Sequence, residues 1–207
     1  PATDLGIARI SEAPERHAMT PGIAGLADER PFFTEPFRDF AQADQREAFG
    51  QAVAAAQVPA VSIDATSEDA NAALAAATAA FPAWRDTPVK ERAAMLCACA
   101  DLMRSRRDML SGVIIRESGK TWREADGDVC EAIDFLEYYA RQAIGLFEPR
   151  RIGQFIGELD TEFQEPRGVA VIISPWNFPL AICCGMSAAA LVTGNTTIIK
   201  PAEQTPG

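Results

Sequence analysis

The chain has 207 residues, of which 48% are hydrophobic and 23% charged, and its formal net charge is −10 at pH 7. This composition is typical of a globular protein, and it argues against DNA or RNA as a partner, because nucleic acid phosphates bind clustered Lys and Arg. The only histidine is His17, which argues against a histidine triad or a histidine-rich metal site. We therefore predict no metal site.

The cysteine pattern indicates a reducing compartment. The chain has five cysteines, which is an odd number. Two of them are adjacent, and none forms a C-x-x-C pair. This pattern is untypical of a disulfide framework. The sequence shows no signal-peptide pattern and no run of about eighteen apolar residues. We therefore expect a cytoplasmic protein without a membrane span.

The first part of the chain is predicted to be a leader followed by a helix. Residues 1–40 contain five prolines and little hydrophobic periodicity, which is typical of an extended leader or linker. A helix is expected over residues 39–57, and residues 58–64 are a candidate strand. The helix would be anchored by Phe40, Phe49 and Val53.

Three further helices are expected before residue 120. An alanine-rich helix covers residues 67–81 and is closed by Pro82. A second covers residues 87–106 and begins with a threonine cap before a proline, which is a common helix start. A third begins near residue 107 and ends at Gly119.

A long amphipathic helix is predicted over residues 121–147. Apolar residues at helical spacing define its buried face: Trp122, Val129, Ile133, Leu136 and Ala140. Acidic residues crowd elsewhere and are interpreted as a solvated face: Glu124, Asp128, Glu131 and Asp134. Residues 155–166 then alternate like an exposed strand pair.

The last forty residues predict a strand, a helix and a strand. Residues 168–174 are a continuous apolar run, typical of a strand buried on both faces of a parallel sheet. A helix follows and stops at Gly194, and residues 195–200 form a β-branched strand. This order predicts a right-handed crossover, the first step of a doubly wound sheet. The predicted fold class is α/β.

Ligands bind such sheets at the carboxyl ends of the strands. Asn177 follows the first strand, and Lys200 and Glu203 follow the second. A lysine and a carboxylate are suited to ribose hydroxyls, and the carboxylate would repel a 2′-phosphate, which favours NAD over NADP. Lys200 is also one of only three lysines in the chain. The glycine fingerprint G-x-G-x-x-G is missing, so a pyrophosphate must be held differently.

Three stretches carry a resemblance to a known family. PWNFP at residues 175–179 and AAALVTGNTTIIKPAEQTP at residues 188–206 resemble the aldehyde dehydrogenase superfamily, as does ESGKTWREADGDV at residues 117–129. The leader PFFTEPFRDFAQADQREAFGQAV further resembles the branch that oxidises L-glutamate γ-semialdehyde. That branch includes free Δ1-pyrroline-5-carboxylate dehydrogenase and the dehydrogenase half of bifunctional proline utilisation proteins.

The resemblance implies roles for individual residues. Asn177 would be the catalytic side-chain donor to the aldehyde oxygen, and Glu131 and Phe178 would flank the substrate. The implied contacts to NAD are Ile173, Ser174, Pro175, Trp176, Lys200, Ala202 and Glu203. From the residues alone, Asn177 is equally well read as a turn residue, and Glu131 as part of a solvated face.

The resemblance also implies an organisation and partners. Residues 1–40 are the leader, and residues 41–150 are the helical part of the cofactor domain. Residues 151–167 are a strand pair used in a homo-oligomer, and residues 168–207 begin a Rossmann-like NAD-binding unit. The family's nucleophilic cysteine and glutamate base would lie beyond residue 207, so the unit is expected to be incomplete. A small aldehyde is the expected substrate, and a proline dehydrogenase domain is a candidate fusion partner.

The implied reaction is oxidation of L-glutamate γ-semialdehyde to L-glutamate with NAD. Cys183 and Cys184 lie on the apolar crossover helix, where inert buried thiols are expected. Two alternatives remain open: a dehydrogenase for another aldehyde such as succinate semialdehyde, and a non-catalytic truncated module for binding or assembly.

Overall fold

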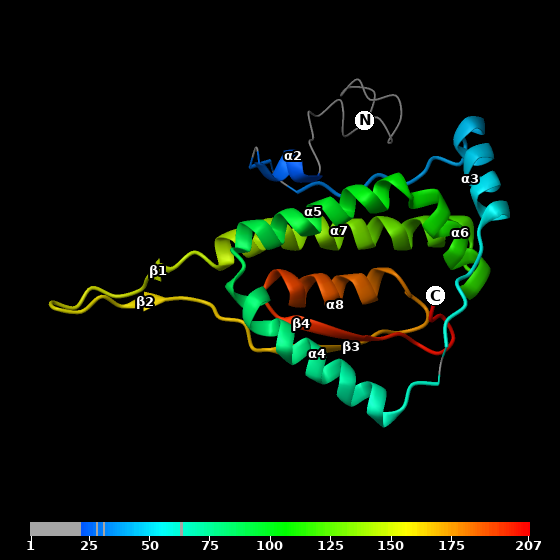
Figure 1. The fold of residues 1–207 in the computed structure, drawn as a ribbon. Coiled ribbons are helices and arrows are strands. Elements are labelled where there is room, and N and C mark those ends of the chain that lie inside the picture. Colours follow the sequence, from blue (N-terminus) through cyan, green and yellow to red (C-terminus); the bar gives the residue numbers. More distant parts are fainter. Residues whose placement is uncertain (1–21, 28, 31, 63) are drawn as a thin grey trace, which may run out of the picture.

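The computed structural model describes residues 22–27, 29–30, 32–62 and 64–207. Its elements are α2 (Gly22–Ala27), α3 (Ala43–Ala55), α4 (Ser67–Asp86), α5 (Val89–Ser105), α6 (Arg107–Ser118), α7 (Trp122–Leu146), β1 (Arg150–Arg151), β2 (Thr161–Glu162), β3 (Val169–Ile173), α8 (Ala181–Val192) and β4 (Thr196–Lys200). They form layers in which α5 and α7 cover α8, α8 covers the β3–β4 sheet, and α4 lies on the far side of that sheet (Figure 1). His17 and most of the proline-rich leader fall outside the described residues.

Helix α7 runs through the centre of the helical layer. It begins after a capping box, in which Thr121 Oγ1 accepts the N–H of Glu124 and the Glu124 carboxylate accepts the N–H of Thr121. Its predicted apolar face is confirmed for Val129 and Ile133, which are fully buried in the core shared with α5 and α8. The glycine stop before it is also confirmed, because Gly119 has a φ of 72°.

The acidic side of α7 is not the solvated face that was predicted. Glu124 and Glu131 are exposed, but Asp128 is buried, as are Asp126 and Glu137 on the same helix. Each buried carboxylate has a basic partner from another turn or element. Arg107 pairs with Asp126 through two bonds of 2.7 and 2.8 Å, Lys120 with Asp128 at 2.6 Å, and Arg104 with Glu137 at 2.7 Å. Helical periodicity does not reveal such partners.

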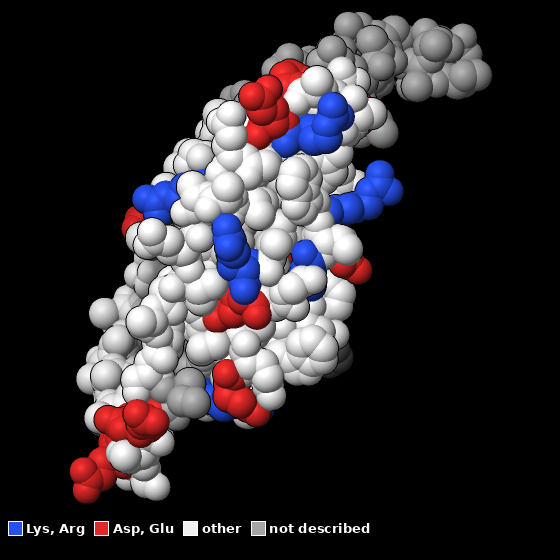
Figure 2. Space-filling view, turned by 90° about the vertical axis from the view of Figure 1, so that its right-hand side faces the viewer, with Lys and Arg blue, Asp and Glu red and all other residues white. Residues whose placement is uncertain are grey.

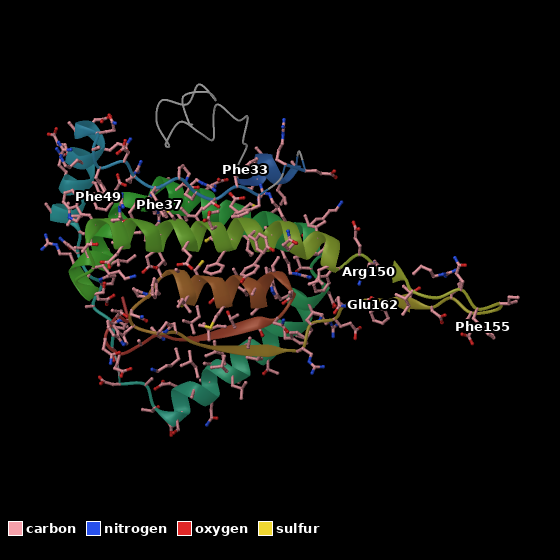
Figure 3. The ribbon with its side chains drawn as sticks, turned by 180° about the vertical axis from the view of Figure 1, so that it is seen from behind. Phe33, Phe37, Phe49, Arg150, Phe155 and Glu162 are labelled. Carbon is pink, nitrogen blue, oxygen red and sulfur yellow. The ribbon has the colours of Figure 1, made fainter. Side chains whose placement is uncertain are left out.

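Part of the leader is bound along the helices. Residues 32–39, called the strap here, contain no helix or strand, yet they lie over α5 and α7 (Figure 3). Asp134 Oδ1 accepts the N–H of Glu35 at 2.7 Å, and Asp126 Oδ2 accepts the N–H of Arg38 at 2.8 Å. An ion pair of 2.8 Å joins the Glu35 carboxylate to Arg104.

Strands β3 and β4 pair in parallel around α8, which confirms the predicted strand–helix–strand order. Val169 lies opposite Thr196, and Ile173 lies opposite Lys200. Gly194 ends the crossover at a φ of 86°, where a Cβ would lie 2.6 Å from Pro166. This close approach and the positive φ together require glycine at this turn.

The strands are not buried on both faces within the described residues. Ile172 is 4% exposed, whereas Val171 is 58% and Ile173 68% exposed. A sheet of two strands offers few neighbours, and α4 covers only part of its outer face. Thr196 Oγ1 donates to the carbonyl of Ala77 in α4 at 2.9 Å, which fixes this partial cover.

Three local predictions were wrong. Thr87 does not cap α5, because the residue before α5 is Pro88, which makes no side-chain cap bond, and Thr87 Oγ1 instead donates to the carbonyl of Ala83 in α4 at 3.0 Å. The candidate strand at residues 58–64 is not one, because residues 58–62 and 64 are exposed and have no strand beside them. Pro82 does not end α4, which continues to Asp86. The last turn of α4 is held from outside, because Trp84 Nε1 donates to the carbonyl of Leu191 at 3.0 Å.

Strands β1 and β2 form an antiparallel hairpin that projects from the layers (Figure 1). Arg150 and Glu162 pair at 2.9 Å at its base, and Phe155 lies far out along it (Figure 3). The paired residues are fewer than the alternating pattern predicted. Within the described ranges, none of the helices is both long and apolar enough to cross a membrane.

Candidate functional site

A cleft of about 600 Å³ lies between the strap, the start of α7 and the loop that joins β3 to α8. Four residues singled out from the sequence line it together: Glu131, Trp176, Asn177 and Phe178. The remaining lining residues are Phe37, Ser118, Lys120, Glu124, Gly127, Asp128, Cys130 and Asp134. The cleft therefore joins residues more than a hundred positions apart in the sequence.

The Ser174–Leu180 loop carries three of these residues and is held at several points. The N–H of Ser174 donates to the carbonyl of Lys200 at 3.2 Å, which continues the sheet by one bond. Thr205 Oγ1 donates to the carbonyl of Trp176 at 3.2 Å. The N–H of Ala181, the first residue after the loop, donates to Asp128 Oδ1 at 2.7 Å. Two prolines in the loop prevent the strand or the helix from extending through it.

Asn177 lies on the wall of the cleft with an exposed side chain. That side chain makes no hydrogen bond with any described residue, so it does not serve as a turn residue that bonds its own backbone. Its amide is free to donate to a ligand in the cleft.

Lys120 and Asp128 are cleft residues for which no functional role was predicted, and Asp128 was expected on a solvated face. Lys120 Nζ lies 4.1 Å from the centre of the Phe178 ring, a cation–π distance, and 2.6 Å from Asp128 Oδ2. The signal for Lys120 was its rarity, because it is one of three lysines. The burial of Asp128 has no signal in the sequence, because its two partners come from other segments.

The cleft is acidic. In the part of the chain that the structure describes, Glu124, Asp128, Glu131 and Asp134 face a single cationic residue, Lys120. Burial raises the pKa of Asp134 to about 6, and the hydrogen bond from the N–H of Glu35 opposes this shift. Because Lys120 is paired with Asp128, the net charge left on the lining is negative at neutral pH.

The residues predicted to hold a cofactor gather at the carboxyl ends of β3 and β4, beside the loop. Lys200 Nζ and Glu203 Oε2 are 3.5 Å apart, and both side chains are largely exposed. Hydrogen bonds from its own backbone and from Gln204, together with the charge of Lys200, hold the pKa of Glu203 below its usual value. Ser174 and Ala202 are buried, so they offer mainly backbone to a ligand.

This end of the molecule suits the ribose part of a dinucleotide. An exposed ammonium group and an exposed carboxylate lie side by side, which supplies a donor and an acceptor for two hydroxyls. Ile173 and Pro175 border the same strand end. Figure 2 shows the face at this end, where acidic and basic side chains alternate in small groups among uncharged ones.

Cys130, which lines the cleft, and Cys184 on α8 are poor nucleophiles. Burial raises the pKa of Cys184 to about 12, and its thiol points to the carbonyl of Ala132 at 3.7 Å. Burial also raises the pKa of Cys130, which lines the cleft. A thiol that stays protonated at neutral pH does not attack an electrophile.

Residues 41–207 match the family described as the aldehyde dehydrogenase family. The chain is 46% identical over 142 residues to 1-pyrroline-5-carboxylate dehydrogenase 2 of Bacillus subtilis, an alignment that covers 69% of this chain and 28% of that relative. The chain therefore spans less than a third of that relative's length.

Two solved structures have a similar fold. The 1-pyrroline-5-carboxylate dehydrogenase from Thermus with bound NAD superimposes with a TM-score of 0.79 at 35% identity, over 85% of this chain and 40% of that one. Proline utilization A from Bdellovibrio bacteriovorus superimposes with a TM-score of 0.80 at 39% identity, over 84% of this chain and 22% of that one.

Proposed function

Because the chain belongs to the aldehyde dehydrogenase family, we propose that it is the amino-terminal part of an NAD-dependent enzyme that oxidises L-glutamate γ-semialdehyde to L-glutamate in proline catabolism. One observation carries the proposal: Asn177, Phe178, Trp176 and Glu131 line a single cleft beside the carboxyl ends of two parallel strands. The relatives named 1-pyrroline-5-carboxylate dehydrogenase support the choice of substrate.

In this proposal Asn177 is the donor to the aldehyde oxygen. When a nucleophile adds to the carbonyl carbon, negative charge develops on that oxygen. An amide donor that is already in place stabilises this charge without having to reorganise. The loop around Asn177 is held by backbone bonds at Ser174 and Ala181, which supplies such a fixed position.

NAD, when bound, supplies the hydride acceptor for the oxidation. Lys200 and Glu203 would hold its adenosine ribose, and the backbone of residues 173–176 and 202 would line its cleft. The Thermus relative with bound NAD supports NAD as the cofactor. The proposed preference for NAD over NADP rests on the Glu203 carboxylate, which would repel a 2′-phosphate.

The charge of the cleft favours L-glutamate γ-semialdehyde over succinate semialdehyde. The first substrate carries an ammonium group, whereas the second is only anionic. Among the described residues, the cleft lining has four carboxylates, no arginine and one lysine that is already paired. Glu131 is exposed on this wall and is placed to attract an ammonium group, while Phe178 offers a ring to the aliphatic chain.

The test is a comparison of both aldehydes with the full-length protein, its Asn177→Ala variant and a matched Asn71→Ala control on the exposed side of α4. We expect higher kcat/KM for L-glutamate γ-semialdehyde. We also expect Asn177→Ala to lower kcat about 100- to 1,000-fold, with no change for Asn71→Ala. Equal or reversed preference would remove the semialdehyde assignment. An intact mass of 22.2 kDa with no turnover would support the non-catalytic module instead.

We further propose a homo-oligomer in which the hairpin contacts a second copy. Its large apolar side chains are strongly exposed: Ile152, Phe155, Ile156, Leu159 and Phe163. An exposed apolar patch of this kind usually marks an interface.

The proline utilization A neighbours support a proline dehydrogenase domain as a fusion partner. The five free cysteines support the cytoplasm as the compartment.

A further inference from the structure

The Asp128 carboxylate joins three segments at the edge of the cleft. Its Oδ1 accepts the N–H of Ala181 at 2.7 Å, and its Oδ2 accepts Lys120 Nζ at 2.6 Å. The side chain of Asp128 is 0% exposed and that of Lys120 is 13% exposed. Asp128 belongs to α7, Lys120 precedes α7, and Ala181 begins α8, so one carboxylate fixes three backbones relative to one another.

Helix α8 has no cap of its own. The residue before it, Leu180, offers no side-chain acceptor, and Pro179 precedes Leu180. The first N–H groups of a helix need acceptors from outside it, and a negative charge is favoured at this end. Asp128 supplies both from a neighbouring helix. It thereby holds the point where the Ser174–Leu180 loop passes into α8, four residues after Asn177.

Lys120 connects the Asp128 carboxylate to Phe178 on the wall of the cleft. It neutralises Asp128, which would otherwise be an unpaired buried charge. Its Nζ also lies 4.1 Å from the centre of the Phe178 ring. The Lys120–Asp128 pair therefore acts on two neighbouring side chains. Lys120 contacts the Phe178 ring directly, and Asp128 acts on the Asn177 amide through the start of α8.

We propose that Asp128 is a positioning residue for aldehyde oxidation, which acts by holding Asn177 in place, and that Lys120 is its counterion and orients Phe178. This inference rests on the proposed function, because it assigns Asp128 a part in that reaction. Asp128 itself does not touch the substrate in this proposal.

Single substitutions would leave a buried charge unpaired, so the test compares two charge-free pairs in the full-length protein. Lys120→Met with Asp128→Asn keeps an acceptor for the N–H of Ala181. Lys120→Met with Asp128→Leu has a similar volume and no acceptor. Both pairs are expected to fold, because apolar replacement of a buried ion pair is often tolerated. The measurements are kcat, the KM for L-glutamate γ-semialdehyde and the Kd for NAD.

We expect the leucine pair to have a kcat about 10- to 100-fold below that of the asparagine pair, because a misplacement of about 1 Å can cost that much. The Kd for NAD should be the same in both pairs. In an Asn177→Ala background the two pairs should have equal kcat, because Asp128 acts through the missing amide. A purely structural effect would persist in that background.

Equal kcat in the two pairs, or an unchanged ratio in the Asn177→Ala background, would overturn the proposal while the proposed function stands. A wild-type protein that oxidises neither aldehyde overturns the proposed function, and with it the catalytic part of this inference. Amide hydrogen exchange at Ala181 tests the tether without any activity. It should be faster in the leucine pair, and unchanged exchange would refute the tether.

Discussion

Asp134 is the described carboxylate on α7 whose ionisation the fold opposes most clearly. Burial raises its pKa from 3.8 to about 6, although the N–H of Glu35 donates to it and Arg104 lies near. A group with a raised pKa adds stability only while it is protonated. Its contribution is therefore fully present below about pH 4 and is lost as the pH rises through about 6.

We expect Asp134→Asn to raise the free energy of unfolding at pH 8, because the amide keeps an acceptor for the N–H of Glu35 without the buried charge. A two-unit shift corresponds to about 2.7 kcal/mol, which solvent screening of this half-buried group reduces to about 1 kcal/mol. The gain should shrink towards pH 4. Urea denaturation at pH 4, 6 and 8 measures it, with the exposed Glu47→Gln as control. A gain of equal size at every pH would contradict the prediction.

For single residues, the sequence predicted which side chains share the cleft better than it predicted the contacts that hold them. Trp176, Asn177 and Phe178 are consecutive, so their grouping follows from one motif. Their support by Asp128 depends on a contact across 53 residues. A pattern of apolar spacing contains no information on such a contact, because it treats every acidic residue as solvated.

The packing of α7 against α8 depends on a glycine. A Cβ on Gly185 would lie 2.7 Å from the Phe135 ring, so the two helices approach closely at this point. A Cβ on Gly145, near the end of α7, would meet no atom within 4 Å, so the same substitution points into open space there. Alanine substitutions at these two glycines therefore distinguish the effect of helix packing on stability from the effect of helix propensity.

We expect Gly185→Ala to lower the free energy of unfolding by about 1–3 kcal/mol, because the added methyl group overpacks the contact with Phe135. Gly145→Ala should raise it by up to about 1 kcal/mol through helix propensity. Thermal or urea denaturation of both variants measures the pair of changes. Stabilisation by Gly185→Ala would show that the helices can separate at no cost.

Among the elements, the helix ends that depend on a glycine were predictable, because Gly119 and Gly194 act through their own backbone angles. The threonine cap predicted at position 87 was wrong, because Thr87 closes α4 and does not begin α5. The other wrong predictions concern elements whose extent depends on contacts with distant parts of the chain. Helix α4 continues past Pro82 because Trp84 in its last turn is held by α8. Residues 58–62 are not a strand because no strand lies beside them.

The projecting hairpin makes a prediction for the whole molecule. Ile156 is 98% exposed and Leu159 76% exposed, so they contribute little to the fold of one chain. We expect Ile156→Glu with Leu159→Glu to reduce the mass of the oligomer in light scattering or sedimentation. Stability of the single chain should change by less than about 0.5 kcal/mol. Gln154→Glu, which adds charge at an already polar hairpin position, is the control and should leave the mass unchanged.

If the double variant and the control have the same mass, the hairpin is not the contact between copies. For the whole molecule, the composition predicted a globular protein, and the order of strand, helix and strand after residue 168 predicted the α/β fold class. The outward course of the hairpin was only partly predictable, since its paired strands are two residues long and the rest of it follows no regular pattern.

The strap has a consequence for the order in which the molecule comes apart. It is joined to α7 by bonds that span 88 and 99 residues, and it has no helix or strand of its own. None of its residues is fully buried, and segments with few buried contacts open before the core does. Phe37 leaves the wall of the cleft when the strap detaches. Mild heat or denaturant should therefore abolish the proposed aldehyde oxidation while α5, α7 and α8 are still packed, so inactivation would precede loss of the fold.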